Sequence, residues 1–423
     1  MARKPKAKIA VIGLGFVGLT TALGFADKGF RVSGYDVYAP IRKSLRARQV
    51  RFHEPHLAEQ LGRYLGKGFQ VSSNLAEAVT NAEVIFYCVG TPSRASGEAD
   101  VSFLTQAVTE TLNCLPAARQ PVLVVKSTVP PGTTMREVFP LFAQAGRVVG
   151  TNIGLANNPE FLREGFAWDD FTQPDRVVIG ANDQFSFEPV ARLYEGFRTT
   201  VCKVSLSTAE FIKSSSNALL ATMISFANEA SIIADQVGNI DVKQAFQILH
   251  MDRRWSGQPA RMTSYVFPGC GFGGYCLPKD TAALLHTARS AGVSANLLQG
   301  VLAANREIQQ HFVRRVLAAT TNQSRIGILG LSFKPDSDDV RDTPAAGIIE
   351  MLLKAGRRQI LAYDPMAMPV YRQVFSHPIQ YVRSLEEVVA GSDVLAILTA
   401  WREFKEKKSV LADKLVFDGR YCL

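Results

Sequence analysis

The chain has few cysteines and no paired-cysteine motif. Its six cysteines are scattered through 423 residues, and none of them form a C-x-x-C pair. This spacing argues against a disulfide framework and a structural zinc site, and it favours a reducing compartment. We therefore expect a cytoplasmic protein with no bound metal.

Long apolar runs and long basic runs are also missing. No segment has 18 uninterrupted apolar residues, so no membrane span is expected. Basic residues between Arg3 and Lys8 precede an apolar stretch, as in a signal peptide, but that stretch carries a glycine pattern with its own meaning. The net charge is +9, yet basic clusters with interleaved aromatic residues are absent, which disfavours nucleic-acid binding. An anionic small-molecule substrate would account for part of this charge.

The length and composition indicate a soluble globular protein with more than one core. The content is 47% hydrophobic and 20% charged, and 423 residues are too many for a single core. We expect an α/β protein in which two Rossmann-like doubly wound domains are joined by a helical middle domain with a long central helix. The expected ranges are 1–204, 205–304 and 305–423.

A strand, a glycine-rich turn and a helix open the chain. Residues 8–12 are β-branched and apolar, residues 13–18 read GLGFVG, and the strand at residues 31–36 ends in Asp36. In such a unit the first glycine makes a tight turn, the second lets a pyrophosphate approach, and the third lets the helix pack on the strand. A carboxylate at Asp36 can accept hydrogen bonds from a ribose diol and repels a 2′-phosphate. The pattern therefore predicts NAD rather than NADP.

Further apolar segments complete the first α/β domain and lead into long helices. Strands are expected at residues 84–89, 122–126 and 177–179. The apolar spacing predicts a continuous helix over 208–237, and a second long helix over 296–319.

A second strand and glycine turn begins near residue 325, where the chain reads RIGILGLSFKP. A helix at 344–355 and strands at 359–363, 394–398 and 415–418 follow. This is a smaller domain of Rossmann type. Its glycine pattern is degenerate, so it need not bind a dinucleotide.

A glycine-rich loop at residues 269–280, GCGFGGYCLPKD, brings together a thiol, an ammonium group and a carboxylate. Cys276, Lys279 and Asp280 lie within five residues, directly after four glycines. A cysteine near a lysine is a candidate nucleophile because the cation favours the thiolate. A metal pair or a disulfide between Cys270 and Cys276 remains an alternative at this point.

Three further segments carry polar groups in suggestive patterns. Residues 126–133, KSTVPPGT, close a strand with a hydroxyl-rich turn, at the sheet edge where ligands bind in such folds. Residues 158–165, NPEFLREG, place Glu160 and Glu164 four apart, so we expect them to share a face of a helical turn; a solvated helix start explains the same spacing. Lys213 and Asn217 are also four apart. They would stabilise an oxyanion or form a polar stripe facing water.

Together these segments resemble the UDP-glucose/GDP-mannose dehydrogenase family of nucleotide-sugar 6-dehydrogenases. The resemblance covers nearly the whole chain, through residues 8–18, 89–92, 126–133, 158–165, 213 with 217, 271–280, 330–341 and 418–420. It implies NAD-dependent oxidation of a sugar C6 hydroxyl to a carboxylate in two hydride transfers, as in the synthesis of polysaccharide precursors. It also implies a homodimer.

The resemblance implies a role for each catalytic residue. Cys276 would attack the C6 aldehyde to give a thiohemiacetal and then, after hydride loss, a thioester, while Lys213 and Asn217 would hold the developing oxyanion. Water would be ordered and activated by Glu164, Thr128 and Asp280. Glu160 would support this group.

The resemblance also implies two sets of binding residues. The expected cofactor contacts are Gly13, Gly15, Phe16, Val17, Gly18, Asp36, Thr91, Thr128, Lys279 and Arg341. The expected substrate contacts are Phe161, Leu162, Arg163, Lys213, Asn217, Arg261, Tyr265, Gly273, Phe333, Lys334 and Arg420. Lys334 and Arg420 suit a diphosphate because both cations bind phosphate oxygens well.

The chain departs from the family pattern at two places. The segment 251–264 is longer than the usual Arg-Ile-Gly segment; Arg261 is the nearest candidate by spacing to Tyr265, with Arg253 and Arg254 as alternatives. A Glu-Pro-Gly-Leu motif is altered, reading EPHL at residues 54–57.

The sequence CLPKD at 276–280 resembles the branch that oxidises simple hexoses. UDP-glucose is therefore the leading substrate, ahead of GDP-mannose or a dTDP-hexose.

Two other functions fit parts of the pattern. A β-hydroxyacid dehydrogenase of the 6-phosphogluconate type also pairs a Rossmann domain with a helical Lys and Asn, but it stops after one hydride transfer and needs no cysteine. A nucleotide-sugar-binding protein without activity would have no reason to keep the complete catalytic set.

Overall fold

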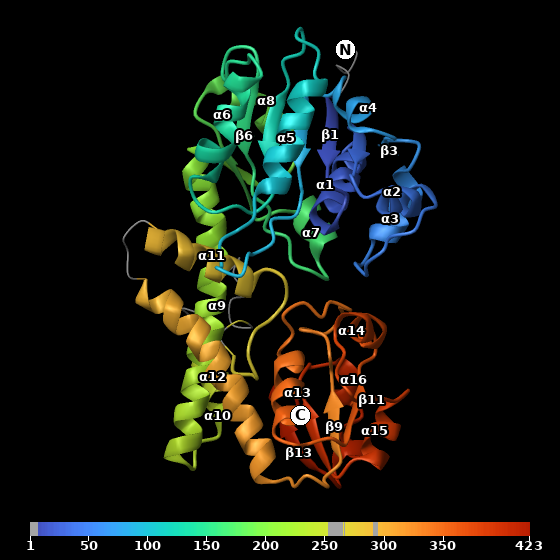
Figure 1. Cartoon of the computed structure of the whole chain (residues 1–423), viewed down its shortest axis with the longest axis vertical. Coiled ribbons are helices and arrows are strands. Elements are labelled where there is room, and N and C mark those ends of the chain that lie inside the picture. Colours follow the sequence, from blue (N-terminus) through green and yellow to red (C-terminus); the bar gives the residue numbers. More distant parts are fainter. Residues whose placement is uncertain (1–6, 253–264, 266, 291–294) are drawn as a thin grey trace. The chain divides into compact units, whose positions relative to one another are not determined.

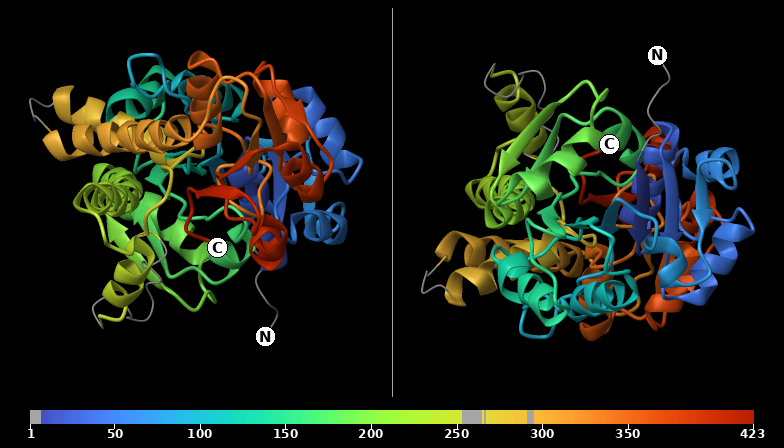
Figure 2. Two further views of the ribbon diagram at one scale, coloured as in Figure 1. Left: turned by 90° about the horizontal axis from the view of Figure 1, so that it is seen from below. Right: turned by 90° about the horizontal axis from the view of Figure 1, so that it is seen from above.

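The computed structural model describes residues 7–252, 265, 267–290 and 295–423 (Figure 1). The chain divides into two compact units, residues 1–216 and 217–423, and each is described by itself. The division falls within helix α9 (Leu206–Val237). At 1.5 Å per residue, its 32 residues extend over about 48 Å. Figure 2 gives two further views of the ribbon, in which the strands of the first sheet are blue to green and those of the second are orange to red.

The first unit is built on an eight-stranded sheet with the order β3-β2-β1-β4-β5-β6-β7-β8. The strands are β1 (Lys8–Ile12), β2 (Arg31–Tyr35), β3 (Phe69–Val71), β4 (Val84–Tyr87), β5 (Val122–Val125), β6 (Gly154–Asn157), β7 (Arg176–Gly180) and β8 (Thr200–Val204). Strands β1 to β6 are parallel, and β7 pairs antiparallel with β6. The order of the first six strands is that of the dinucleotide-binding fold, in which ligands bind where the strand order reverses, here between β1 and β4.

Helices cover both faces of this sheet because successive residues of a buried strand point to opposite sides. Ile9 and Val11 of β1 belong to one core with α1, α3 and α8, whereas Ala10 and Ile12 belong to another core with α4, α5 and α6. The helices of this unit are α1 (Phe16–Asp27), α2 (Ala39–Arg46), α3 (Leu57–Tyr64), α4 (Leu75–Val79), α5 (Ser102–Cys114), α6 (Phe139–Gln144), α7 (Ala167–Thr172) and α8 (Gln184–Leu193).

The second unit contains a five-stranded parallel sheet with the order β11-β10-β9-β12-β13. Its strands are β9 (Ile326–Leu329), β10 (Ile360–Tyr363), β11 (Gln380–Tyr381), β12 (Val394–Ile397) and β13 (Leu415–Asp418). Its helices, besides the end of α9, are α10 (Val242–Leu249), α11 (Leu277–Ser290), α12 (Asn296–Ala318), α13 (Pro344–Lys354), α14 (Met368–Val374), α15 (Leu385–Gly391) and α16 (Arg402–Glu406).

The long helix α12 belongs to two apolar clusters of the second unit. Phe312 and Val316, near its end, are buried in the core of the five-stranded sheet together with Ile328. Val301, near its start, packs with Phe272 of the glycine-rich loop. The helix therefore links the sheet to the loop that carries Cys276.

The predicted α/β class, with two Rossmann-like sheets and a long helix, is confirmed. The helices predicted at 208–237 and 296–319 are α9 and α12, and each predicted strand is present within two residues of the expected ends. The short strands β3, β6, β8 and β11 were not predicted. Among the helices that the structure describes, none is both long and apolar enough to cross a membrane.

Candidate active site

The first glycine turn has the shape needed to hold a dinucleotide. Gly13 has φ 88°, and a Cβ atom there would lie 2.6 Å from the carbonyl oxygen of Cys88. A Cβ on Gly18 would lie 1.8 Å from the Gly13 oxygen, so α1 packs directly on the turn. A Cβ on Gly15, in contrast, would meet no atom within 4 Å, so its backbone borders open space that a pyrophosphate can enter. These residues fit NAD.

Asp36, at the end of β2, holds this turn in place. Its carboxylate is 8% exposed and accepts hydrogen bonds from the amides of Leu14 and Tyr38, both at 2.8 Å. A carboxylate can accept about four hydrogen bonds, which leaves capacity for a ribose diol. Close to the switch point, the Thr91 hydroxyl donates to the Thr128 carbonyl at 2.7 Å and joins the segments after β4 and β5.

A buried ion pair links the loop after β6 to helix α9. Lys213 Nζ lies 2.9 Å from Glu160 Oε1, and both side chains are less than 10% exposed. The second oxygen, Oε2, accepts the Leu162 amide at 2.6 Å. The ring of Phe161 lies near two cations, with its centre 5.5 Å from Lys213 Nζ and 4.1 Å from Arg176 Cζ. The carboxylate of Glu160 is therefore held by groups from both the loop and the helix.

The prediction that Glu160 and Glu164 share a face of a helical turn is wrong. Residues 158–163 have no regular secondary structure, and a turn follows at Glu164 and Gly165. Gly165 has φ 86°, and the Glu160 side chain bonds to its own loop rather than to a helical neighbour. Arg163, a predicted substrate contact, pairs with Asp170 through its Nη2 atom at 2.6 Å and is 53% exposed.

A second buried cation lies close to Glu160. Lys126 Nζ donates to Asn158 Oδ1 at 3.1 Å, and the same oxygen accepts the Tyr194 hydroxyl at 2.6 Å. Burial lowers the pKa of Lys126 to about 8; nearby Cys88 and Glu160 oppose this shift, and Lys213 adds to it. Burial also raises the pKa of the Cys88 thiol to about 12. Sequence reasoning included Lys126 only as part of a motif and assigned no role to its charge.

In the second unit, Cys276 stands directly before α11. Its carbonyl oxygen accepts the Asp280 amide at 2.8 Å, which is the first hydrogen bond of the helix. The positive end of a helix favours a thiolate. Asp280 is buried, lies 2.5 Å from Lys279 Nζ, and accepts a hydrogen bond from the Asn217 amide. Cys276 and this polar group are therefore one helical turn apart.

Two asparagines hold the loop before Cys276, and sequence reasoning missed both. Asn228 Oδ1, on α9, accepts the Gly269 amide at 2.6 Å. Asn305, on α12, bonds to both backbone groups of Phe272, at 2.8 and 3.1 Å. A polar amide side chain inside a long helix is the sequence signal that could have pointed to these residues. Their partners are 41 and 33 residues away, so the sequence could not identify what they bind.

The predicted nucleotide contacts surround the same loop. Arg420 donates to the Gly271 carbonyl at 2.9 Å, and its Nη2 atom is buried with no hydrogen-bond partner among the described residues. The guanidinium of Arg341 lies 4.4 Å from the Tyr275 ring. A Cβ on Gly274 would lie 2.8 Å from the ring of Phe333. Lys334 Nζ lies 5.4 Å from the centre of the same ring.

Gly273 and Tyr265 complete the predicted set in this unit. A Cβ on Gly273 would lie 2.3 Å from the carbonyl oxygen of Asp342, so this position requires glycine. Tyr265 is partly buried. Arg261 and its alternatives Arg253 and Arg254 lie outside the described residues.

Cys270 is the other cysteine of the glycine-rich loop, and it is buried. Its thiol is buried and donates to the Leu398 carbonyl at 3.7 Å, and burial raises its pKa. All six cysteines are free. The alternative of a disulfide between Cys270 and Cys276 is therefore wrong for this structure.

The second sheet does not repeat the dinucleotide site of the first. Asp364, the counterpart of Asp36, is completely buried, and its carboxylate accepts hydrogen bonds from Leu331, Ser332, Trp401, Met366 and Ala367. These hydrogen bonds occupy the acceptor sites of the Asp364 carboxylate, so none is left for a ribose hydroxyl.

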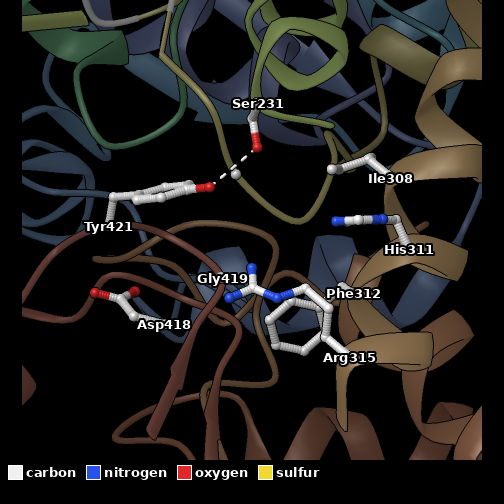
Figure 3. Close-up of a pocket in the computed structure, with 9 residues that line it drawn as sticks. Ser231, Ile308, His311, Phe312, Arg315, Asp418, Gly419 and Tyr421 are labelled. Carbon is white, nitrogen blue, oxygen red and sulfur yellow. Dashed lines mark hydrogen bonds between the residues drawn. The ribbon is translucent and has the colours of Figure 1, made fainter. Parts of the chain in front are cut away.

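Two cavities among the described residues lie elsewhere. Figure 3 shows one lined by Ser231, His311, Arg315, Asp418 and Tyr421, among others, in which the Tyr421 and Ser231 hydroxyls are 3.0 Å apart. Its volume of about 10 Å³ holds one water molecule, so a nucleotide sugar does not fit. A groove of about 390 Å³ lies beside Glu83 and Pro121, at the opposite end of β4 and β5 from the glycine turn.

The fold and the glycine turn define an NAD-binding dehydrogenase, and comparison with known proteins gives its family. The NAD-binding, central and UDP-binding domains of the UDP-glucose/GDP-mannose dehydrogenase family match residues 7–198, 207–307 and 327–423. The UDP-glucose 6-dehydrogenase TuaD of Bacillus subtilis is 35% identical, over 98% of this chain and 89% of its own length.

Solved structures agree with this assignment. A UDP-glucose dehydrogenase from Pyrobaculum islandicum has a TM-score of 0.91 and 35% identity, covering 100% of this chain and 96% of its own. A UDP-D-ManNAc dehydrogenase from Pyrococcus horikoshii has a TM-score of 0.86 and 26% identity, covering 98% and 96%. The chain belongs to the UDP-glucose/GDP-mannose dehydrogenase family. It is an NAD-dependent oxidoreductase that acts on a nucleotide sugar.

Proposed function

We propose that this enzyme oxidises UDP-glucose to UDP-glucuronate in two hydride transfers through a thioester on Cys276. The observation that carries the proposal is the position of Cys276 at the start of α11, one turn from the buried group of Asn217, Lys279 and Asp280. A two-electron dehydrogenase has no need of a thiol there. NAD, when bound, accepts the hydride of each oxidation.

The first oxidation converts the C6 hydroxyl to an aldehyde. The C6 hydroxyl proton goes to water ordered by Glu164, and Lys213, held by Glu160, stabilises the developing alkoxide. Asn217 lies one turn further along α9, so both donors can face the same oxygen. Each such donor is typically worth about 3 kcal/mol in the transition state.

The second oxidation requires a tetrahedral carbon that can lose hydride. The Cys276 thiolate adds to the aldehyde carbon, and the thiohemiacetal loses hydride to become a thioester. Water, activated by Glu164 with Thr128 and Asp280, then attacks the acyl carbon. The C–S bond breaks, and the carboxylate and the free thiol are released.

The test is the amount of NADH formed per UDP-glucose consumed, with Cys276→Ala as the comparison. We expect two NADH per sugar from the native enzyme, and loss of the acid product with Cys276→Ala because no thioester can form. A single NADH per sugar would instead indicate the β-hydroxyacid type of reaction. Undiminished acid production by Cys276→Ala would eliminate the thioester.

UDP-glucose is proposed over other substrates because relatives acting on it resemble this chain over its whole length. The similarity to a UDP-D-ManNAc dehydrogenase is lower. NADH formation with a panel of UDP-, GDP- and dTDP-hexoses tests this choice. We expect the highest kcat/KM with UDP-glucose.

We further infer a homodimer, in the cytoplasm, with ranges 1–204 for NAD, 205–304 for the helical part and 305–423 for the nucleotide sugar. The three matched family domains support these ranges. Phe211, Leu219 and Phe226 support the dimer: they are 54%, 54% and 57% exposed along α9. A reducing compartment would keep the Cys276 thiol free to react.

A further inference from the structure

A carboxylate distant in sequence holds the end of the loop that carries Glu164. Glu54 lies in the connection between α2 and α3 and is 6% exposed. Its Oε2 atom accepts the Gly165 amide at 2.8 Å, and its Oε1 atom accepts the Ala167 amide at 2.9 Å. These partners are 111 and 113 residues away, so the contact exists only in the folded unit.

The two amides depend on an acceptor from outside their own segment. Gly165 follows Glu164 directly and turns the chain with φ 86°. Ala167 begins α7, and Phe166 before it provides no side-chain cap. The first amides of a helix have no partner within the helix, so Glu54 supplies the missing acceptor.

The start of the same loop is held as well. Glu160 is bound to Lys213 at 2.9 Å and to the Leu162 amide at 2.6 Å. The loop from Glu160 to Gly165 is therefore fixed by one carboxylate at each end, and Glu164 is adjacent to the end that Glu54 binds.

The residues that follow Glu54 constrain its backbone. Pro55 follows it, and His56 adopts φ 68°, a left-handed conformation that is strained for a residue other than glycine. Leu57 and Leu61, on the helix that follows, are completely buried in the core. A strained conformation persists only where the surrounding packing determines it.

We propose that Glu54 is a positioning residue that holds the turn after Glu164 and thereby aims the Glu164 carboxylate at the water that hydrolyses the thioester. The inference rests on the proposed function. In the hydrolysis, water bonds to the acyl carbon, its proton goes to Glu164, and the Cys276 thiolate leaves. A displacement of about 1 Å in a positioned group can cost about 100-fold in rate.

The experiment uses the full-length enzyme with Glu54→Gln, NAD and UDP-glucose. The glutamine keeps one acceptor but turns an NH₂ group toward the second amide. We expect hydrolysis to become the slow step, so that the steady rate falls about 10- to 100-fold and acylated Cys276 accumulates. Intact-protein mass spectrometry after acid quenching measures the acylated fraction. The KM for UDP-glucose should fall together with kcat, so that kcat/KM changes less than about twofold, since the steps before the thioester are not affected.

Two variants calibrate this result. Glu164→Gln removes the group that Glu54 is proposed to aim, and it should also accumulate the acyl-enzyme. Asp183→Asn removes a carboxylate that accepts the Ser186 amide at 2.7 Å at the start of α8 in the same unit. It controls for general loss of stability and should show no acylated cysteine. If Glu54→Gln does not fold, Glu54→Asp replaces it, because it keeps the charge but moves both acceptors.

The outcomes separate the two proposals. Accumulation of acylated Cys276 in the Glu54 and Glu164 variants, but not in Asp183→Asn, supports the positioning role of Glu54. Accumulation in Glu164→Gln alone overturns that role and leaves the proposed function intact. Accumulation in none of the variants removes the role of Glu164 in hydrolysis, and the role of Glu54 with it.

Discussion

Lys126 is a cation enclosed by the first unit, where it contacts Asn158 and lies near Cys88, Glu160 and Lys213. Its side chain has lost most of its hydration, since the residue is 4% exposed. Keeping the charge there costs stability, and the cost is greatest while the lysine is protonated in both the folded and the unfolded state.

This burial predicts that Lys126 makes stability rise with pH. Its pKa is about 8 in the folded state against an ordinary value of 10.5, so the unfolded chain binds more protons between these values. Relative to Lys126→Met, the native free energy of unfolding should gain about 2 kcal/mol from pH 7 to pH 9.5. Urea denaturation of both proteins at both pH values measures this. Because Cys88 is present in both, its own titration largely cancels, and an equal difference at both pH values would contradict the prediction.

Gly13 and Gly15 provide a matched pair of substitutions in one turn. At Gly13, alanine would combine a φ of 88° with a contact of 2.6 Å, so Gly13→Ala should lower the melting temperature and weaken NAD binding. At Gly15, alanine meets open space, so Gly15→Ala should leave the melting temperature unchanged. Its methyl group would project where the pyrophosphate approaches, and the Kd for NAD should rise at least about tenfold. Thermal unfolding without ligand and NAD titration measure the two effects, and equal destabilisation by both variants would contradict this account.

The end of helix α5 depends on one arginine from another part of the chain. Arg147 is 8% exposed and donates to the carbonyls of Leu115, Pro116, Ala117 and Arg119 at 2.8 to 3.3 Å. The last carbonyls of a helix and of the turn after it need donors from elsewhere. The five donors of a guanidinium in one plane can serve four of them at once.

Arg147→Met should therefore destabilise the protein strongly. Removing the guanidinium deprives four carbonyl oxygens of their charged hydrogen-bond donor. We therefore expect a loss of about 3 kcal/mol in the free energy of unfolding. Arg63→Met is the control, because Arg63 is 57% exposed and forms a surface ion pair with Glu59 one turn away; it should cost less than about 0.5 kcal/mol. Urea denaturation measures both, and equal losses would show that Arg147 is not a special anchor.

Helices and strands could be predicted where their own residues show a clear apolar spacing or turn pattern. Strand β1 reads KIAVI and is followed by glycines, and α9 keeps apolar helical spacing along its 32 residues, about nine turns. Strand β6 reads GLAN, which has no β-branched residue, and its pairing with β5 and β7 makes it a strand. The Glu160–Glu164 spacing suggested a helical turn, but Pro159 and the side-chain bonds of Glu160 favour an irregular loop.

At the scale of the whole molecule, the exposed stripe on α9 predicts a dimer of 46.2 kDa chains. Phe211, Leu219 and Phe226 are spaced by eight and seven residues, so they follow one face of the helix. Leu219→Asp with Phe226→Asp should yield a monomer, because a second copy covering this face would bury two charges. Light scattering after size exclusion measures the mass. Phe103→Asp, at a site on α5 that is equally exposed, should remain dimeric; a dimeric double variant would contradict the prediction.

The candidate site was predictable as far as its motifs carry the chemistry. The glycines at 13, 15 and 18 could be recognised because they lie in one short segment whose spacing fits a dinucleotide turn, while the roles of Cys276, Lys213 and Asn217 came from the family resemblance and stay predictions. The supports of the site could not be assigned. Glu54, Asn228 and Asn305 act on backbone groups 111, 41 and 33 residues away, and no local pattern encodes such distances.

The sequence by itself determined the class of fold and the cofactor, because hydrophobic periodicity and glycine turns are properties of short segments; the reactive groups it points to stay predictions. Only the tertiary structure decided how those groups are held. It showed that the Glu160 loop is not helical, that Lys126 is a buried cation, and that Asp36 and Asp364, similar in sequence position, differ in free acceptor capacity. The reason is physical: burial and hydrogen bonding depend on which distant segments meet, and that is settled by packing.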